Sequence, residues 1–335
     1  MDNPIIYRPQ ELLALARSGA DAVEFSPLAE QPFLLMDSQV ALSDTEIEAL
    51  GAWLARLSCP TIALAVDDSA LTDACDLRIK SEPEAASVLR TVVRCPTAAT
   101  VLVQVLRVTE SMLLEDALDV ESLAYATLQS GSEYLAWLEE NRTAEPFEPT
   151  DDGPAVLWDR NGDEISLELN RASNRNAMSE EMRDAFNDVL QFAVLDSSLP
   201  KLRISGRGKC FSVGGDLSEF GTVPNPAMGH IVRTLSVPGR LLARCAERAT
   251  VHLHGACIGS GMEFPAFAGR LVAEKNTHFQ LPEVGMGLIP GAGGCISIAR
   301  RIGRQRTAWL ALSGKRIRAA QALEWGLVDE IEQAG

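Results

Sequence analysis

HGACIGSGMEFPAFAGRLVAEKNTHFQLPEVGMGLIPGAGG, residues 254–294, contains the glycine-rich turn that decides the fold. Its first part, GACIGSGME at 255–263, follows a predicted strand at 250–253, and a similar turn, FSVGGD at 211–216, follows a predicted strand at 201–204. Most turns of this kind only let the chain reverse closely. Where such a turn opens a helix, its backbone N–H groups lack acceptors and lie in the positive potential of the helix dipole. Two of them converging on one point would stabilise a carbonyl oxygen that gains charge as an enolate forms.

The rest of the C-terminal half alternates predicted strands with predicted helices. Residues 155–169 have the pattern of two strands around a turn at Asn161-Gly162, and residues 179–195 have the pattern of a helix capped by Ser179. A closing helix is predicted at 319–326. This alternation indicates an α/β fold.

Composition narrows the class of protein. The 335 residues are 46% apolar, which is enough to fill ordinary cores, and the apolar runs are too short to span a bilayer. The seven cysteines are scattered and never form a C-x-x-C pair, so we expect neither disulfides nor a zinc site, and a cytoplasmic location. A formal charge of −16 argues against nucleic acid or an anionic membrane as a partner. An anionic ligand would need a local basic patch.

A linker divides the chain. Residues 141–154, NRTAEPFEPTDDGP, are rich in proline and acidic residues, which is typical of a segment between two folded parts. We therefore expect two domains, residues 1–150 (the N-terminal half) and residues 151–335 (the C-terminal half).

Five stretches of the C-terminal half together resemble one family. NRASNRNAMSEEM, FSVGGDL, HGACIGSGMEF, LPEVGMGLIPGAGG and SGKRIRAAQALEWGLVDEI are similar, in this order and spacing, to the signatures of the crotonase (enoyl-CoA hydratase/isomerase) superfamily. The resemblance covers residues 153–332. It implies an α/β fold of the ClpP/crotonase type, a spiral of ββα units, and an acyl-CoA thioester as substrate. It also implies no separate cofactor, since coenzyme A is part of the substrate, and a homo-oligomer, a trimer or a hexamer.

The resemblance assigns an oxyanion hole to the peptide N–H groups of Val213 and Ser260. Ser260 departs from the glycine that is usual in the family, and this places a side chain beside the reacting thioester. Further substrate contacts are expected from the neighbouring turn residues Gly214, Gly215, Asp216, Gly259 and Gly261. For Asp216 the residues themselves favour a simpler role, the N-cap of a helix that begins at Leu217.

Two carboxylates carry the expected chemistry. Glu263 and Glu283 match the family's two catalytic glutamates. Hydration of a 2-enoyl thioester requires a base to deprotonate one water and an acid to protonate the α-carbon, and two close carboxyls that share one proton can do both. The alternatives are a helix first-turn acid for Glu263, and for Glu283 an ion pair with Arg300 or Arg301.

Arg171 and Arg175 match the stretch that runs near the adenosine end of coenzyme A in the family. They could supply the basic patch that the acidic chain requires. The alternative is that both are solvated surface arginines.

The N-terminal half contains a fainter resemblance to the same family. CPTIALAV at 59–66 and ACDLRI at 74–79 resemble two of the family's strands, but residues 68–72 replace the glycine turn and its glutamate. Apolar positions between 113 and 128 predict an amphipathic helix similar to the family's last helices. One interpretation is a degenerate crotonase copy that supplies these helices to the C-terminal half. The other is an unrelated α/β or helical extension.

Several functions therefore compete. The first is an enoyl-CoA hydratase acting through Glu263 and Glu283. An isomerase, an acyl-CoA hydrolase or a C–C hydrolase of the same fold would share the oxyanion hole but need another arrangement of bases. A catalytically silent subunit is suggested by the unusual N-terminal half and by Ser260.

Overall fold

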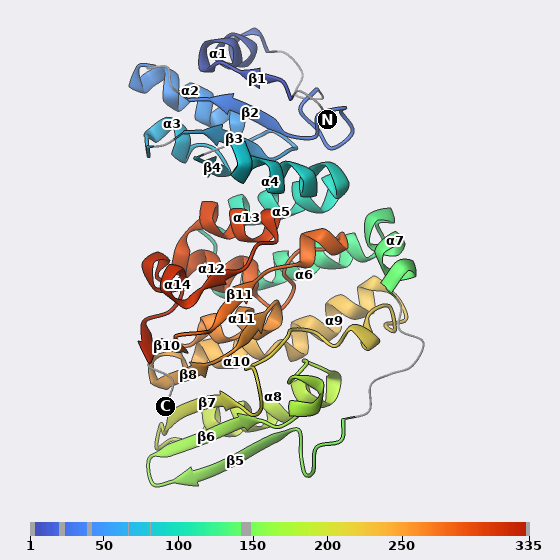
Figure 1. Ribbon diagram of the computed structural model, residues 1–335, viewed down its shortest axis with the longest axis vertical. Coiled ribbons are helices and arrows are strands. Elements are labelled where there is room, and N and C mark those ends of the chain that lie inside the picture. The colour runs from blue at the N-terminus through green and yellow to red at the C-terminus, as the bar shows by residue number, and fades with distance from the viewer. Residues whose placement is uncertain are drawn as a thin grey trace.

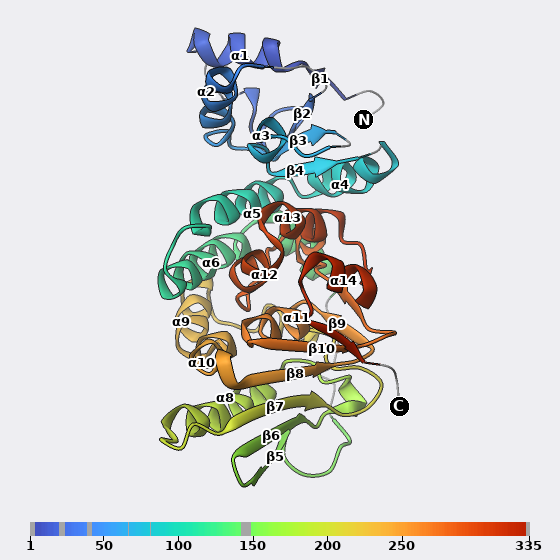
Figure 2. The ribbon, with the colours of Figure 1, turned by 90° about the vertical axis from the view of Figure 1, so that its left-hand side faces the viewer.

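Two sheets built mainly of parallel strands lie at opposite ends of the molecule, with a layer of helices between them (Figures 1 and 2). The computed structural model describes residues 4–19, 24–38, 42–65, 67–80, 82–141 and 149–332. Half of the predicted linker, residues 142–148, lies outside these residues. Both halves therefore contain strands and helices, as an α/β fold requires.

The N-terminal sheet has four parallel strands in chain order. They are β1 (Ile6–Tyr7), β2 (Leu34–Asp37), β3 (Thr61–Leu64) and β4 (Leu77–Ile79), connected through α1 (Pro9–Ser18), α2 (Asp44–Leu54) and α3 (Ala70–Asp73). Side chains alternate between its faces. Leu34 and Met36 belong to a small core with α1 and α2, whereas Phe33 and Leu35 belong to the main core of the molecule.

The C-terminal half contains a six-stranded sheet in the order β13-β10-β8-β7-β6-β5 and a three-stranded sheet in the order β12-β11-β9. The strands of the larger sheet are β5 (Val156–Asn161), β6 (Glu164–Leu169), β7 (Lys201–Gly206), β8 (Ala249–Leu253), β10 (Arg270–Glu274) and β13 (Glu330–Glu332). The smaller sheet consists of β9 (Ala256–Ile258), β11 (His278–Gln280) and β12 (Ile317–Arg318). β5 and β6 form the predicted hairpin, and Gly162 adopts a positive φ of 61° in its turn.

The helices of the C-terminal half include the two that were predicted, at 179–195 and 319–326. They are α8 (Glu180–Leu195), α9 (Pro226–Ser236), α10 (Pro238–Arg244), α11 (Ser260–Glu263), α12 (Gly294–Ile302), α13 (Arg304–Ser313) and α14 (Ala319–Trp325), with short 3-10 turns that include η2 (Ala172–Asn174), η3 (Leu217–Glu219) and η6 (Glu283–Met286). Ser179 caps α8 as predicted, because its side chain accepts the N–H of Met182. The two glycine turns differ, since FSVGGD opens only η3 whereas GACIGSGME opens α11.

Four helices of the N-terminal half, α4 (Glu82–Arg94), α5 (Pro96–Thr109), α6 (Leu114–Gln129) and α7 (Ser132–Asn141), cover the C-terminal half; they are called the covering helices below. They pack on α9, α12, α13 and η6, and the main core contains buried side chains of both halves. No single described helix is long and apolar enough to cross a membrane. Two consecutive helices, Glu84–Arg94 and Pro96–Thr109, reach that length and composition only together, and the pair is bent by 108° at the break between them.

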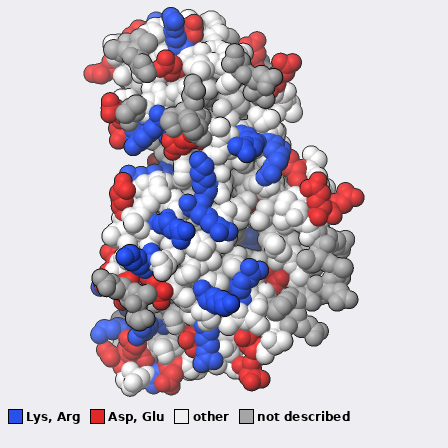
Figure 3. Space-filling view, in the orientation of Figure 1, with Lys and Arg blue, Asp and Glu red and all other residues white. Residues whose placement is uncertain are grey.

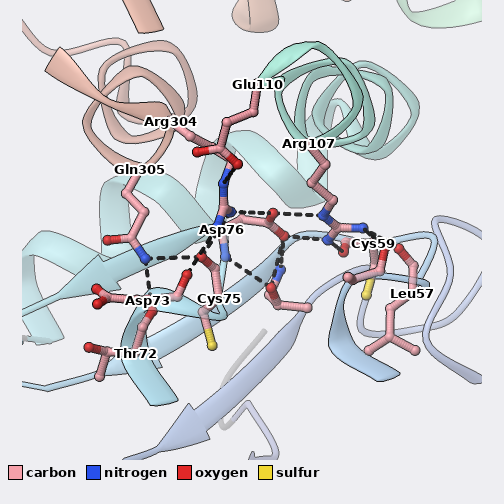
Figure 4. Close-up of polar contacts among 12 residues, drawn as sticks. Leu57, Cys59, Thr72, Asp73, Cys75, Asp76, Arg107, Glu110, Arg304 and Gln305 are labelled. Carbon is pink, nitrogen blue, oxygen red and sulfur yellow. Dashed lines mark hydrogen bonds and ion pairs between the residues drawn. The ribbon is translucent and has the colours of Figure 1, made fainter. Parts of the chain in front are cut away.

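A buried carboxylate connects the N-terminal sheet to these helices (Figure 4). Asp76, 1% exposed, precedes β4 and accepts hydrogen bonds from the guanidinium of Arg107 on α5 and from the backbone N–H of Thr61. Arg304 of α13 donates to the same carboxylate and to the carbonyl oxygens of Cys75 and Asp73. The N-terminal sheet is therefore docked on the C-terminal half through ion pairs as well as apolar contacts.

Candidate active site

The two glycine-rich turns lie side by side. The N–H of Phe211 donates to His254 O at 2.8 Å, and Ser212 and Ile258 join the two segments through further backbone hydrogen bonds. Glycine allows this closeness, because a β-carbon at Gly261 would lie 2.4 Å from Ser212 O. One at Gly214, where φ is 97°, would lie 2.7 Å from Ile258 O. The predicted juxtaposition of the turns is therefore present.

The two predicted oxyanion donors differ in their present partners. The N–H of Ser260 begins α11 and has no acceptor among the described residues. The N–H of Val213 donates to Arg175 O at 3.2 Å, so a substrate oxygen would have to share or replace that contact. Ser260 Oγ is buried and also has no partner in the described part of the chain. Unsatisfied buried polar atoms are rare in folded proteins, and they mark a place where a ligand or water binds.

Glu263 is the last residue of α11 and is 2% exposed. Its Oε2 accepts the N–H groups of Ala292 at 2.7 Å and of Gly294 at 3.1 Å, at the N-terminus of α12. A β-carbon at Gly294 would lie 2.5 Å from Glu263 Cγ, so this glycine makes room for the carboxylate. The carboxylate of Glu263 therefore interacts with the positive N-terminus of α12 and not with that of α11. Its other oxygen, Oε1, is left for another partner.

Glu283 begins η6 and faces the same place. A β-carbon at Gly259 would lie 2.5 Å from Glu283 Oε1 and 3.8 Å from Glu263 Oε1, so both carboxyls approach one point beside the second glycine turn. Glu283 Oε2 is buried and has no partner among the described residues. The alternative ion pair is wrong, because Arg300 donates to Met112 O and Arg301 to Ala266 O.

Both carboxyls are difficult to ionise. Burial raises the pKa of Glu263, although the N–H groups of Ala292 and Gly294 oppose that shift. Burial also raises the pKa of Glu283, with an added contribution from the negative charge of Glu263. Two neighbouring acids with raised pKa values favour sharing one proton over losing both, so the pair can act as base and acid together.

The structure tests the remaining predicted residues. Asp216 is the N-cap of η3, where its carboxylate accepts the N–H of Ser218 at 2.9 Å, as the simpler interpretation expected. Arg171 is 7% exposed, and its side chain donates to Glu181, Gly153 O and Asn170 O. It is not a solvated surface arginine, because the fold uses its guanidinium, and its contact with coenzyme A stays a prediction.

Arg175 lies where a ligand could meet it. It is exposed and adopts a positive φ of 53°, and its carbonyl accepts the N–H of Val213. Its place in substrate binding stays a prediction. Lys and Arg side chains also form a band down the middle of one face of the molecule (Figure 3). This acidic protein therefore has a local concentration of positive charge, which an anionic ligand requires.

A third carboxyl was missed in the sequence. Glu121 of α6 is 2% exposed, and its two oxygens accept the N–H groups of Gly293 at 2.7 Å and of Cys295 at 2.8 Å. The buried face of α6 consists of Ala117, Leu118, Glu121, Ser122, Ala126 and Leu128. A glutamate four residues after Ala117 and three after Leu118 lies on an otherwise apolar face, and this is the signal that could have identified it.

Comparison with known proteins places this site in a family. The family model for enoyl-CoA hydratase/isomerase matches residues 161–334. A 2,3-dehydroadipyl-CoA hydratase of Escherichia coli is 31% identical over 171 residues, and a 1,2-epoxyphenylacetyl-CoA isomerase of the same organism is 29% identical over 171 residues. Each match covers 50% of this chain and 65% of the relative, so the chain spans just under two thirds of the length of these relatives.

A solved structure agrees with this result. The crystal structure of an enoyl-CoA hydratase from Thermoplasma volcanium superposes with a TM-score of 0.50 at 29% identity, over 54% of this chain and 72% of that protein. The matched region of this chain has the crotonase fold, as the sequence motifs predicted. The chain therefore belongs to the enoyl-CoA hydratase/isomerase family.

Proposed function

We propose that this protein is an enoyl-CoA hydratase, which adds water across the double bond of a 2-enoyl-CoA thioester. The observation that carries the proposal is the approach of Glu263 and Glu283 to one point beside the N-terminus of α11. Two carboxyls with raised pKa values can orient one water and exchange its protons. The family's substrates are acyl-CoA thioesters, which suits the band of basic side chains (Figure 3).

The reaction needs both parts of the site. The ionised carboxylate removes a proton from water while the water oxygen bonds to C3 of the substrate. The C2–C3 π electrons move toward the thioester, and its oxygen gains negative charge that the N–H groups of Ser260 and Val213 stabilise. The protonated carboxyl then delivers its proton to C2, and the product is a 3-hydroxyacyl-CoA. One glutamate thus gains the proton that the other loses.

The test is a direct assay of the purified full-length protein. Mixing it with crotonyl-CoA, and in parallel with long-chain and aryl 2-enoyl-CoAs, should remove the absorbance of the conjugated thioester. Mass spectrometry should then find a product heavier by one water. Absence of any change with all three substrate classes would reject hydration.

An isomerase of the same family is the second candidate. It is favoured by the relative named an isomerase, which is almost as similar as the one named a hydratase. Moving a double bond needs only one base that takes a proton and returns it elsewhere, and Glu283, with its unpartnered Oε2, could do that alone. A product of unchanged mass from a 3-enoyl-CoA would decide for isomerisation. Failure to bind any acyl-CoA in calorimetry would decide for a silent subunit.

A further inference from the structure

The N-terminus of α12 is divided between two carboxylates from different halves of the chain. Four successive N–H groups alternate between them: Ala292 and Gly294 donate to Glu263, whereas Gly293 and Cys295 donate to Glu121. All four bonds are between 2.7 and 3.1 Å long. Gly293 is the N-cap of α12 and Gly294 and Cys295 are its first two residues, whose N–H groups have no acceptor within the helix, so the two side chains complete the capping of α12.

Glu121 is buried among groups that belong to the site. Glu263 faces it from α11, Glu283 from η6 and the Cys295 thiol from α12, and Arg233 of α9 is the nearby cation. Arg233 itself lies 4.4 Å from the ring centre of Tyr125, one turn after Glu121 on α6. Burial raises the pKa of Glu121, and the charge of Glu263 raises it further. A carboxyl in this position is costly to bury, so its two backbone contacts have to offset that cost.

We propose that Glu121 is a positioning residue of the active site, through which the N-terminal half holds Glu263 in place for the reaction. By binding Gly293 and Cys295, its carboxylate fixes the turn whose other two N–H groups hold Glu263 Oε2. Glu263 Oε1 is thereby kept toward Gly259 and Glu283, where the water has to bind. The inference rests on the proposed function, since it assigns Glu263 to proton transfer.

The charge of Glu121 has a second effect. After burial and the charge of Glu263, the charge of Glu121 also raises the pKa of Glu283. Removing it should lower the pH at which the carboxyl pair loses its shared proton. Both substitutions weaken the two backbone contacts, because aspartate is one methylene too short and the glutamine side chain has one acceptor oxygen for two N–H groups. Only glutamine removes the charge, so the pH profile separates charge from positioning.

The experiment compares Glu121→Gln, Glu121→Asp and the control Asp119→Asn in the full-length protein. Asp119 lies on the same helix and binds Arg240 of α10, so it also connects the halves but does not touch α12. We expect Glu121→Gln to lower kcat by about 10- to 100-fold with KM nearly unchanged, because Glu263 would be displaced from its position. The same variant should shift the pH profile of kcat to lower pH. Glu121→Asp should lower kcat without that shift, and Asp119→Asn should leave both unchanged.

Three results would overturn the proposal: a Glu121→Gln enzyme with wild-type kcat and pH profile, an equal loss in Asp119→Asn, or failure of both Glu121 variants to fold, which would make the residue purely structural. A readout independent of activity separates this from the proposed function. In protein labelled with ¹³C at the glutamate carboxyls, the Glu283 signal, assigned through Glu283→Gln, should titrate at lower pH in Glu121→Gln than in wild type. If wild type hydrates no enoyl-CoA, the proposed function fails, whereas the titration still decides the role of Glu121.

Discussion

The N-terminal sheet and the central strands of the six-stranded sheet have the same arrangement but different uses. β1-β2-β3-β4 are parallel neighbours in chain order, and so are β6, β7, β8 and β10. In both sheets a helix of four residues lies between the third and fourth strand, α3 in one and α11 in the other. This order supports the interpretation of the N-terminal half as a reduced copy of the family fold, which remains a prediction.

The connection around the short helix makes the difference. Between β3 and β4 the chain has no glycine, and α3 ends at the exposed Asp73. Between β8 and β10 it has Gly255, Gly259, Gly261 and Gly269, and α11 ends at the buried Glu263. A parallel sheet alone therefore provides no site. The N–H donors and the buried carboxylate come from a connection that glycine allows to approach its neighbour closely.

The largest effect should come from separating the two regions. Residues 151–335 expressed alone should be insoluble or inactive, because the covering helices would no longer bury the apolar faces of α12 and α13 or supply Glu121. Supplying residues 1–150 as a second chain should restore activity. Sedimentation and the crotonyl-CoA assay provide the measurement. A soluble, fully active fragment would show that the N-terminal half is not needed for activity and is an independent appendage.

Matched substitutions at the ends of the two short helices should differ almost as strongly. Glu263→Gln should lower kcat by about 10² to 10⁴, the usual contribution of a general acid or base, while acyl-CoA affinity stays nearly constant. Asp73→Asn, at the corresponding end of α3, should leave kcat unchanged, because its side chain is exposed.

Glu283→Gln should resemble Glu263→Gln, and the double variant should lose less than the sum of the two free-energy losses. Full additivity would count against two carboxyls on one water.

Much of this site was accessible from the sequence because its parts are local. The glycine turns, the strands before them and the carboxylates of Glu263 and Glu283 all lie in short motifs whose order and spacing identify the family. The hairpin at Gly162, the cap at Ser179 and the amphipathic helix near residues 113–128 follow from local patterns of turn, cap and apolar residues. Such features depend on neighbours a few positions away, so a single sequence reveals them.

The parts that were wrong or missed depend on polar contacts of the folded chain. Arg171 was expected either to meet coenzyme A or to be a solvated surface arginine, but it is buried and donates to Glu181 and to Asn170 O, which no pattern of apolar residues indicates. Glu121 interrupts an apolar stripe, and its partner N–H groups lie more than a hundred residues away in sequence. Periodicity treats such a residue as a defect of the stripe, whereas the fold uses it as a cap. Long-range polar pairing is the information that hydrophobic pattern does not contain.

A smaller effect on activity is expected at the glycine that admits Glu263. Gly294→Ala should lower kcat by about 10²-fold, because the added carbon would lie 2.5 Å from Glu263 Cγ and displace the carboxyl from its two N–H donors. The control is Gly51→Ala in α2, beside the N-terminal sheet, where the added β-carbon would lie 3.2 Å from Ala74 Cβ. Gly303→Ala is unsuitable as a control, because φ at Gly303 is 84° and alanine would be strained there. Gly51→Ala should keep wild-type kcat. Equal losses in both variants would remove the distinction between the two regions.

Docking of the N-terminal sheet should affect stability more than catalysis. Asp76→Asn removes a buried charge that binds Arg107 and Arg304, and breaking such a pair costs about 3–5 kcal/mol. Asp68→Asn alters an ion pair whose carboxylate is 74% exposed, and should cost no more than about 1 kcal/mol. Urea unfolding followed by circular dichroism measures both. If Asp76→Asn is as stable as wild type, the polar cluster of Figure 4 does not hold the two regions together.

A separate effect should appear in how stability depends on pH. Burial raises the pKa of Glu121, of Glu263 and of Glu283 above the value of 4.5 that an unfolded glutamate has. A raised folded-state pKa means that the folded protein binds more protons than the unfolded chain at intermediate pH, so the free energy of unfolding falls as pH rises from about 4.5 through the folded pKa values. Glu121→Gln removes one of these three groups. As pH rises from about 5 to about 8, the free energy of unfolding of the variant should therefore fall by less than that of wild type. The N-terminal sheet contributes none of the three groups. Urea unfolding at intervals across this range gives the slope, and an identical slope for the two proteins would mean that Glu121 ionises as it does in the unfolded chain.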